Sequence, residues 1–203
     1  NFTLYLRFKE NRVPYENFNL LHYEQDSVWN CEDYTDETWP KQFIYMHLAT
    51  GSETAFAEGA EVITYMNYNE MKPWISTTTG HRGSRYESFK QRKAERLLKC
   101  LEKQRPGIIS NIEHYYTSTP LTYRDFTATS EGSIFGYAHS IKDPLYNMIT
   151  PKTKVPNLLL TGQNINTHGI LGVIISALLT CSELIGKTEL TEHIKEINDN
   201  NKQ

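Results

Sequence analysis

Hydrophobic and polar residues alternate along several short stretches in the first third of the chain. Residues 2–8 (FTLYLRF) place a large apolar side chain at every second position, which is the period of a half-buried strand. Residues 17–23, 41–48 and 61–68 are rich in apolar and aromatic residues and predict further strands. The small and hydroxyl-bearing residues of 49–59 predict a loop. We therefore expect a meander of about four antiparallel strands at the start of the chain.

A helical period replaces this alternation between residues 84 and 105. Its apolar face is formed by Tyr86, Phe89, Ala94, Leu97, Leu98 and Leu101. Ser84 and Glu87 have the spacing of a capping box, and Pro106-Gly107 predicts the end of the helix. The opposite face is basic and carries Arg85, Lys90, Arg92, Lys93, Arg96, Lys99, Lys103 and Arg105. Such a face is either simply solvated or a docking surface for phosphate or anionic lipid, and both interpretations stay open.

The other predicted elements are shorter. Residues 108–116 predict a strand, residues 121–125 a single helical turn, and residues 188–197 a short terminal helix. Residues 127–136 are rich in Thr, Ser and Gly, a composition typical of backbone that turns tightly or passes close to a ligand. Residues 13–40 accumulate acidic side chains without Lys or Arg, which indicates a solvated face or, alternatively, a cation site.

The most informative stretch runs from Pro156 to Gly186. Residues 157–161 (NLLLT) form a short apolar run that predicts a strand, and a polar loop follows it. From Gly169 onward apolar residues surround the helix axis, interrupted by Ser176, Thr180, Ser182 and Glu183, so we expect a buried helix. A strand, a glycine-containing loop and a buried helix present backbone N–H groups and a positive dipole end to an anionic or carbonyl-bearing ligand. The pattern predicts a cofactor site without naming the cofactor.

Composition narrows the classes of function. The 203 residues suffice for one large domain or two small ones, and 22% charged with 38% hydrophobic residues is typical of a globular protein. A net charge of −3 gives no reason to expect nucleic acid as a partner. The three cysteines are far apart, so we expect reduced packing residues and a cytoplasmic location. The seven histidines show no ligand spacing, which argues against a metal site, and no complete nucleotide-binding or hydrolase motif is present.

The start of the sequence resembles the middle of a strand. It begins Asn-Phe-Thr-Leu, without Met and without a basic or apolar leader, so we expect a fragment of a longer protein. The apolar run 170–185 is shorter than the ~20 residues that a membrane-spanning helix needs, and it carries Glu183. We therefore favour a buried helix over a membrane span.

Two places carry candidate chemistry. His168 stands at the predicted start of the apolar helix, where it is either a ligand-binding or acid–base group or a loop histidine bonded to the backbone. Tyr123, Arg124 and Asp125 offer an acid, a cation and a carboxylate beside the Thr/Ser/Gly segment. Pairing of Arg124 with Asp125 or another carboxylate is the commoner arrangement for such a trio.

Three segments carry a resemblance to a known group. NLLLTGQN at 157–164, followed by THGILGVIISA at 167–177, is similar to the C-terminal FAD motif of the phytoene desaturase-like flavoproteins. This group includes carotenoid desaturases, carotenoid isomerases and retinol saturases, within the amine-oxidase-like superfamily. YESFK at 86–90 and YTSTPLT at 116–122 leading to EGSIFG at 131–136 resemble the same group in order and spacing. The chain departs from many desaturases at one position, Gly169, where they have a proline.

The resemblance implies a two-domain flavoenzyme of mixed α+β and α/β architecture. Residues 1–150 would form a substrate-binding domain with an antiparallel sheet and the helix 84–105. Residues 151–203 would form the C-terminal strand–helix piece of a Rossmann-like FAD-binding domain whose N-terminal half is missing. The implied cofactor-binding residues are Gly162, Gln163 and Asn164 along the ribityl and pyrophosphate, and His168, Gly169, Ile170, Leu171 and Gly172 at the pyrimidine edge of the flavin. Reduced flavin is negatively charged at that edge, so the N–H groups of a helix start would stabilise it.

The implied activity is that of an FAD-dependent oxidoreductase. It would desaturate or saturate C–C bonds of a long apolar, carotenoid- or retinoid-like substrate by hydride exchange with flavin, with NAD(P) as a candidate electron partner. A flavin-dependent cis/trans isomerase of polyenes is the alternative within the group, and a non-catalytic recognition fragment is the alternative outside it. The resemblance identifies no acid or base residue.

The isolated chain is expected to lack activity and to be incompletely covered. Residues 158–160 would need neighbouring parallel strands, and residues 170–185 a covering layer, from the missing half. Unless another segment covers them, we therefore expect exposed apolar surface or self-association. Peripheral membrane contact through the basic helix is a further hypothesis.

Overall fold

The computed structural model describes residues 1–25, 27–48, 55–137, 140, 142, 149–165 and 167–200. The chain divides into a first unit, Asn1–Ile134, and a second unit, Phe135–Gln203. The predicted loop at 49–59 lies largely outside the described residues. The assignment of residues 1–150 to a substrate domain and 151–203 to a cofactor domain stays a prediction.

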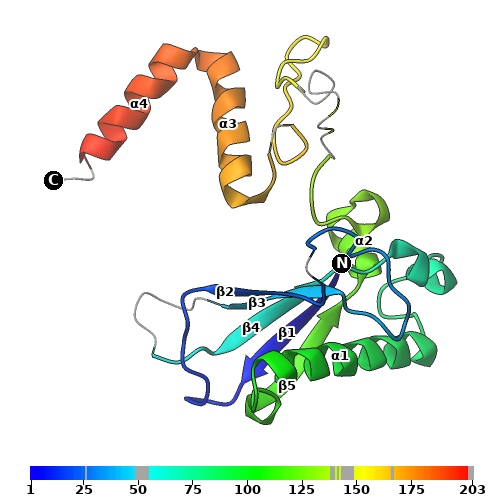
Figure 1. Cartoon of the computed structure of the whole chain (residues 1–203). Helices are drawn as coiled ribbons and strands as arrows, with labels where there is room; N and C mark the ends of the chain where they lie inside the picture. The colour runs from blue at the N-terminus through cyan, green and yellow to red at the C-terminus, as the bar shows by residue number, and fades with distance from the viewer. Residues whose placement is uncertain are drawn as a thin grey trace. The chain divides into compact units, whose positions relative to one another are not determined.

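A five-stranded antiparallel sheet forms the first unit (Figure 1). Its strands are β1 (Phe2–Phe8), β2 (Asn19–Tyr23), β3 (Gln42–His47), β4 (Gly59–Thr64) and β5 (Ile112–Ser118). All five overlap the predicted strands. Their spatial order is β2-β3-β4-β1-β5, so the simple meander was wrong, since β1 lies inside the sheet between β4 and β5. Both edges of β1 can accept a partner, and β5, which returns after a long helix, takes the second edge.

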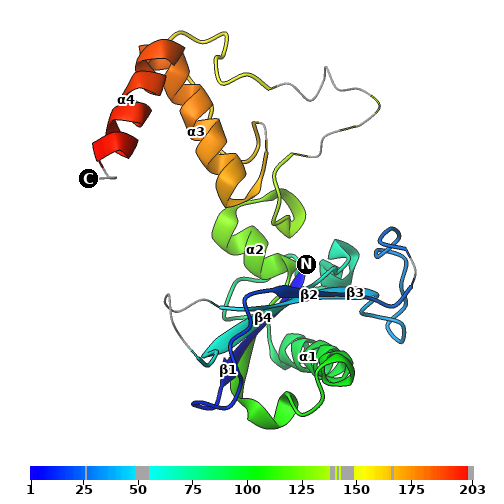
Figure 2. The ribbon, with the colours of Figure 1, turned by 60° about the vertical axis from the view of Figure 1, so that its left-hand side comes forward.

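The core lies between the sheet and the long helix α1 (Ser84–Gln104). Its members include Phe2, Leu4, Leu6, Phe8, Phe43, Tyr45, Val62, Phe89, Leu97 and Leu101. The strand residues in this set alternate along each strand, so one face of the sheet is buried. Figure 2 shows α1 on this side of the sheet and α2 (Pro120–Thr127) on the other. Burial of each such large side chain stabilises the unit by about 1.5–3 kcal/mol.

The start of α1 differs from the prediction. Gly83, with φ +78°, precedes the helix, and Ser84 is already its first helical residue. Among the described residues no side chain caps this N-terminus, so the predicted capping box of Ser84 and Glu87 was wrong. A capping side chain belongs to the residue just before the helix, and a glycine there supplies none.

The basic face of α1 was also partly mispredicted, because Lys93 is buried. Its side chain is 1% exposed, and its ammonium group lies 2.7 Å from Glu70 Oε2 and 2.9 Å from Asp36 Oδ1. The same group lies 4.6 Å from the ring centroid of Trp39, a cation–π distance. Lys93 holds the pKa of Asp36 below its ordinary value through their hydrogen bond. Part of the acidic stretch 13–40 is thus the counter-charge of a buried lysine.

The remaining elements are η1 (Tyr68–Trp74), η2 (Ile109–Asn111), η3 (Ser130–Gly132), α3 (Gly169–Ile185) and α4 (Lys187–Asn200). α3 and α4 confirm the two helices predicted near the C-terminus, and a sharp turn at Gly186 joins them (Figure 1). α2 is longer than the single turn expected at 121–125. Thr119 and Thr122 form a capping box at its start, and Pro120 occupies the first turn, where a missing N–H costs nothing.

The strand predicted at 157–161 was wrong. The structure has an isolated bridge between Lys152 and Leu159 there, and Asn157 has φ +63°, outside the range of a strand. A strand needs a neighbouring strand to pair its backbone groups. An apolar run cannot supply that partner by itself, so it forms a loop in this chain.

Two further findings apply to the residues that the structure describes. None of their helices is long and apolar enough to cross a membrane. They also contain no group of three or more His, Cys, Asp or Glu side chains placed to hold a metal ion.

We predict that Lys93→Met lowers the free energy of unfolding by about 3 kcal/mol, because it leaves the carboxylates of Glu70 and Asp36 without their buried cation. Urea denaturation measures this effect. Lys99→Met, on the exposed side of the same helix, is the matched control and should change stability by less than about 0.5 kcal/mol. Equal effects of the two substitutions would contradict the assignment of Lys93 to the core.

Candidate functional site

The predicted cofactor site centres on the first turn of α3, in the second unit. His168 has extended backbone, Gly169 has φ +79°, and among the described residues no side chain caps this helix start. A Cβ added to Gly162 (φ +100°) or to Gly169 would meet no described atom within 4 Å. The first N–H groups of α3 therefore have no side-chain cap among the described residues, and an uncapped helix start can bind an anionic or carbonyl group.

Two hydroxyl groups of α3 hold the segment that leads to this turn. The Ser176 hydroxyl accepts a hydrogen bond from the N–H of Gly162 (3.0 Å), and the Thr180 hydroxyl donates one to the carbonyl of Leu160 (2.8 Å). Ser176 is fully buried. The sequence pattern alone shows Ser176 and Thr180 only as polar interruptions of an apolar helix. Their spacing of four, which places both hydroxyls on one face, was the signal that could have identified this role.

Gly172 allows Thr167 of the preceding loop to lie close to the backbone of α3. A Cβ at this position would lie 2.5 Å from the carbonyl oxygen of Thr167 and 2.7 Å from its hydroxyl oxygen. No side chain fits at such distances without moving the backbone. Gly172 therefore lets the loop pass tightly against the first turn of the helix.

The end of the matched segment 131–136 meets the same loop. A Cβ at Gly136 would lie 2.2 Å from the carbonyl oxygen of Gln163. The ring of Phe135 packs on the ring of His168, with 4.7 Å between centroids and 52° between planes. The last two residues of the segment 131–136 thus lie beside the loop in the second unit, a contact that the sequence does not predict.

The predicted site residues differ in exposure. Gly172 is buried, Gly162 and Gln163 are half-buried, and Asn164, His168, Gly169, Ile170 and Leu171 are exposed. Ile170 and Leu171 are 85% and 71% exposed, although the all-round apolar pattern predicted a buried helix. The expectation of a buried α3 is therefore not met by the described part of the chain. The accompanying expectation of exposed apolar surface is confirmed.

The face of the first unit's sheet that lies away from α1, which we call the open face, carries both apolar and ionisable side chains. Tyr5 lies opposite Glu61 on β4 and opposite Tyr116 on β5, and all three lie on the face away from α1. Apolar side chains of the same face are half-buried or exposed and include Leu21, Ile44, Met46 and Ile63. Burial raises the pKa of Glu61. The face combines apolar area with a carboxyl group that retains its proton more readily than usual.

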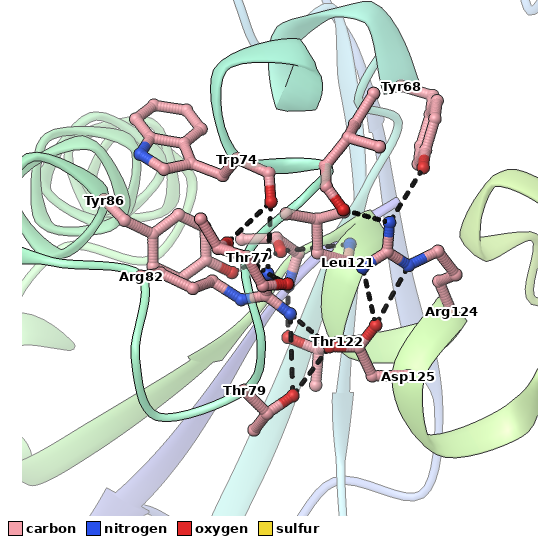
Figure 3. A network of polar contacts seen from close by, with 12 residues as sticks. Tyr68, Trp74, Thr77, Thr79, Arg82, Tyr86, Leu121, Thr122, Arg124 and Asp125 are labelled. Atoms are coloured by element: carbon pink, nitrogen blue, oxygen red, sulfur yellow. Dashed lines mark hydrogen bonds and ion pairs between the residues drawn. The ribbon is translucent and has the colours of Figure 1, made fainter.

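Asp125 pairs with two arginines in the first unit, and Figure 3 shows both guanidinium groups directed toward it. Arg124 Nη2 lies 2.8 Å from Asp125 Oδ1, and the deeply buried Arg82 pairs with the other oxygen. Thr79 donates a hydrogen bond to the same carboxylate (2.7 Å). The expected pairing of Arg124 with Asp125 is confirmed.

Both guanidinium groups also donate hydrogen bonds to main-chain carbonyls. Arg82 Nη1 donates to the carbonyl of Thr77 (2.9 Å), and Arg124 Nη1 donates to that of Ile75 (2.9 Å). Burial opposes ionisation of Asp125, but its bonds from Thr79 and Arg124 and the nearby positive charges keep its pKa below the ordinary value. The network fastens the loop 75–83 to α2, so its role is structural.

Tyr123 has a structural contact as well. Its hydroxyl forms a 2.5 Å hydrogen bond with that of Thr3, which joins α2 to β1 on the open face of the sheet. Burial raises the pKa of Tyr123, so the hydroxyl stays protonated at neutral pH.

We predict that Asp125→Asn lowers the thermal midpoint at neutral pH and that the difference disappears in acid. The lowered pKa of Asp125 means that its stabilising contribution is present above the ordinary aspartate value of about 3.9 and is lost as the pH falls through the folded-state value. The loss at neutral pH should be about 1–3 kcal/mol, because two arginines lose their counter-charge. Thermal unfolding at several pH values tests this, with Asp33→Asn, an exposed aspartate, as the control. A difference that persists unchanged in acid would contradict it.

Comparison with known proteins gives one consistent group of relatives, although no protein-family model matches the chain. The human all-trans-retinol 13,14-reductase is 31% identical over 133 residues, which is 64% of this chain and 22% of that protein. The protein of the same name from Danio rerio is 28% identical over 153 residues, 74% of this chain and 23% of the relative. That from Rattus norvegicus is 32% identical over 120 residues.

The chain spans about a fifth of the length of these curated relatives. All the named proteins belong to the retinol saturase branch of the group that the three sequence motifs resemble. The predicted resemblance is therefore confirmed, since the chain is similar in sequence to proteins named all-trans-retinol 13,14-reductase.

Proposed function

We propose that this chain is part of an FAD-dependent oxidoreductase that saturates a C–C double bond of a long, apolar, retinoid-like substrate. The observation that carries the proposal is the similarity to proteins named all-trans-retinol 13,14-reductase, whose names describe a reduction. The chain would contribute a substrate-binding sheet in its first unit and one edge of the cofactor site in its second. Its assignment to a Rossmann-like FAD domain is part of this proposal.

The geometry at α3 fits a flavin cofactor. Its uncapped first turn offers N–H donors, and no described atom lies within 4 Å of a Cβ placed at Gly162 or Gly169. Backbone donors at a helix start suit both a pyrophosphate and the anionic edge of a reduced flavin ring. The residues that would hold the cofactor are the glycines and Gln163 and Asn164 before the helix, and His168 to Gly172 at its start.

The roles of the chain's own groups follow from their contacts. Ser176 and Thr180 hold the loop so that the N–H groups of α3 keep their direction, and Gly172 sets the distance between loop and helix. When bound, FAD would supply hydride transfer to the double bond, with NAD(P) as the candidate source of electrons. The open face of the sheet would hold an apolar chain by burial of Leu21, Ile44 and Met46.

The exposed apolar face of α3 supports a further part of the proposal. Its side chains include Ile170, Leu171, Val173, Ile174 and Leu184, all at least 40% exposed. Contiguous apolar surface of this kind favours association. The isolated chain would therefore be inactive and self-associate, and the remaining length of the protein would cover this helix.

We predict that the full-length protein that contains this sequence binds FAD and, supplied with reductant, adds two hydrogen atoms to all-trans-retinol. Absorbance of the purified protein shows the flavin, and mass spectrometry of the product shows the added hydrogens. A product of unchanged mass would mean isomerisation instead. A full-length protein without flavin would overturn the proposal.

We predict that Gly172→Val lowers the flavin content of the purified full-length protein at least about tenfold, because the new side chain displaces Thr167 and the first turn of α3. Cys181→Ala, an exposed position on the same helix, is the control and should retain normal flavin. Flavin-to-protein absorbance ratios measure both. Normal flavin in Gly172→Val would show that this turn does not hold the cofactor.

A further inference from the structure

Phe135 and Gly136 contact the candidate cofactor loop from a separate stretch of the chain. Gly136 approaches the backbone of Gln163 so closely that an added Cβ would lie 2.2 Å from its carbonyl oxygen and 2.8 Å from its carbonyl carbon. The Asn164 side-chain oxygen would lie at 3.1 Å. Ordinary Cβ contacts do not occur below 3.0 Å, so any other residue must push the loop away.

The reason for glycine at this position is space alone. Gly132, four residues earlier, has φ +63°, a conformation that itself favours glycine. Gly136 has no such left-handed conformation, so an L-residue could adopt its backbone. What excludes a side chain there is the carbonyl of Gln163, a residue that the resemblance assigns to the cofactor. The close approach therefore specifies the position of the loop.

The aromatic contact acts on the other end of the same loop. Phe135 packs at 4.7 Å between centroids on His168, which directly precedes α3. This centroid distance is within the range of favourable ring contacts. Neighbouring residues thus contact both ends of the stretch 163–168, while Ser176 holds Gly162 from the helix side.

We infer that Phe135 and Gly136 are positioning residues, and that together they clamp the cofactor loop so that the first turn of α3 meets the flavin in a fixed place. This inference rests on the proposed function for the identity of the ligand. The contacts between the clamp and the loop do not depend on it. Cofactor affinity would then include no cost for ordering the loop, because the loop is already held.

The experiment uses the full-length protein and measures loop mobility and FAD affinity independently. Amide hydrogen exchange of residues 162–171 is measured by mass spectrometry after FAD has been removed, and FAD affinity is measured by titration. Gly136→Ala and Phe135→Ala should each speed exchange in 162–171 and weaken FAD binding, both by about tenfold, because opening of the loop becomes easier. Phe135→Tyr keeps the ring and should behave as the parent protein.

The controls make the same two substitutions, Gly→Ala and Phe→Ala, at positions away from the loop. Gly80→Ala adds a methyl group where no described atom lies within 4 Å, and Phe126→Ala removes a 75% exposed ring of α2. Neither should change exchange in 162–171. If Gly136→Ala does not fold, the difference in exchange between Phe135→Ala and Phe135→Tyr tests the same inference.

Each outcome distinguishes the two proposals. Unchanged exchange in both clamp variants overturns the clamp, even if FAD binding weakens, because the residues would then act by touching the cofactor directly. Faster exchange in a protein whose parent form binds no FAD supports the clamp and overturns the flavin function. Faster exchange with weaker FAD binding supports both.

Discussion

Burial of apolar side chains is the main constraint on this structure. The first unit satisfies it, whereas the second unit leaves an apolar helix exposed. In the first unit, the alternating residues of five strands and the apolar stripe of α1 cover each other and form a continuous core. In the second, α3 is apolar all round, yet among its described residues only Gly172 and Ser176 are buried. The first unit thus has a continuous core. The second presents an apolar helix that the described residues leave largely exposed.

The contacts around α3 show what organises the candidate site in the absence of a core. Hydroxyl groups of the helix bind the backbone of the preceding segment, and glycines permit approaches that no side chain would allow. Such contacts fix main-chain positions, which is what a site built from backbone N–H donors requires. The network of Arg82, Arg124 and Asp125 does the same for the loop 75–83, with guanidinium groups as donors and carbonyls as acceptors (Figure 3).

The relation to retinol saturases connects these observations with a chemistry. A reductase of a long polyene needs an apolar surface for the substrate and a polar, backbone-lined edge for its cofactor. Under the proposed function, the sheet of the first unit would serve as the apolar surface and the start of α3 as the cofactor edge. The position of Lys93 shows that charge pattern alone does not predict exposure. Lys93 belongs to the basic face of α1, yet its side chain is buried and pairs with Glu70 and Asp36.

Local pattern by itself determined the strands of the sheet, α1, α3 and α4. Period and composition suffice there, because amphipathic burial and chain stiffness act over a few neighbouring residues. Tertiary structure alone decided that β1 lies inside the sheet, that 157–161 has no strand partner, and that Lys93 is buried. It also decided that Gly136 touches Gln163. Each of these features depends on which distant segment of the chain packs against the residue concerned. The pattern within one stretch of sequence does not identify that segment.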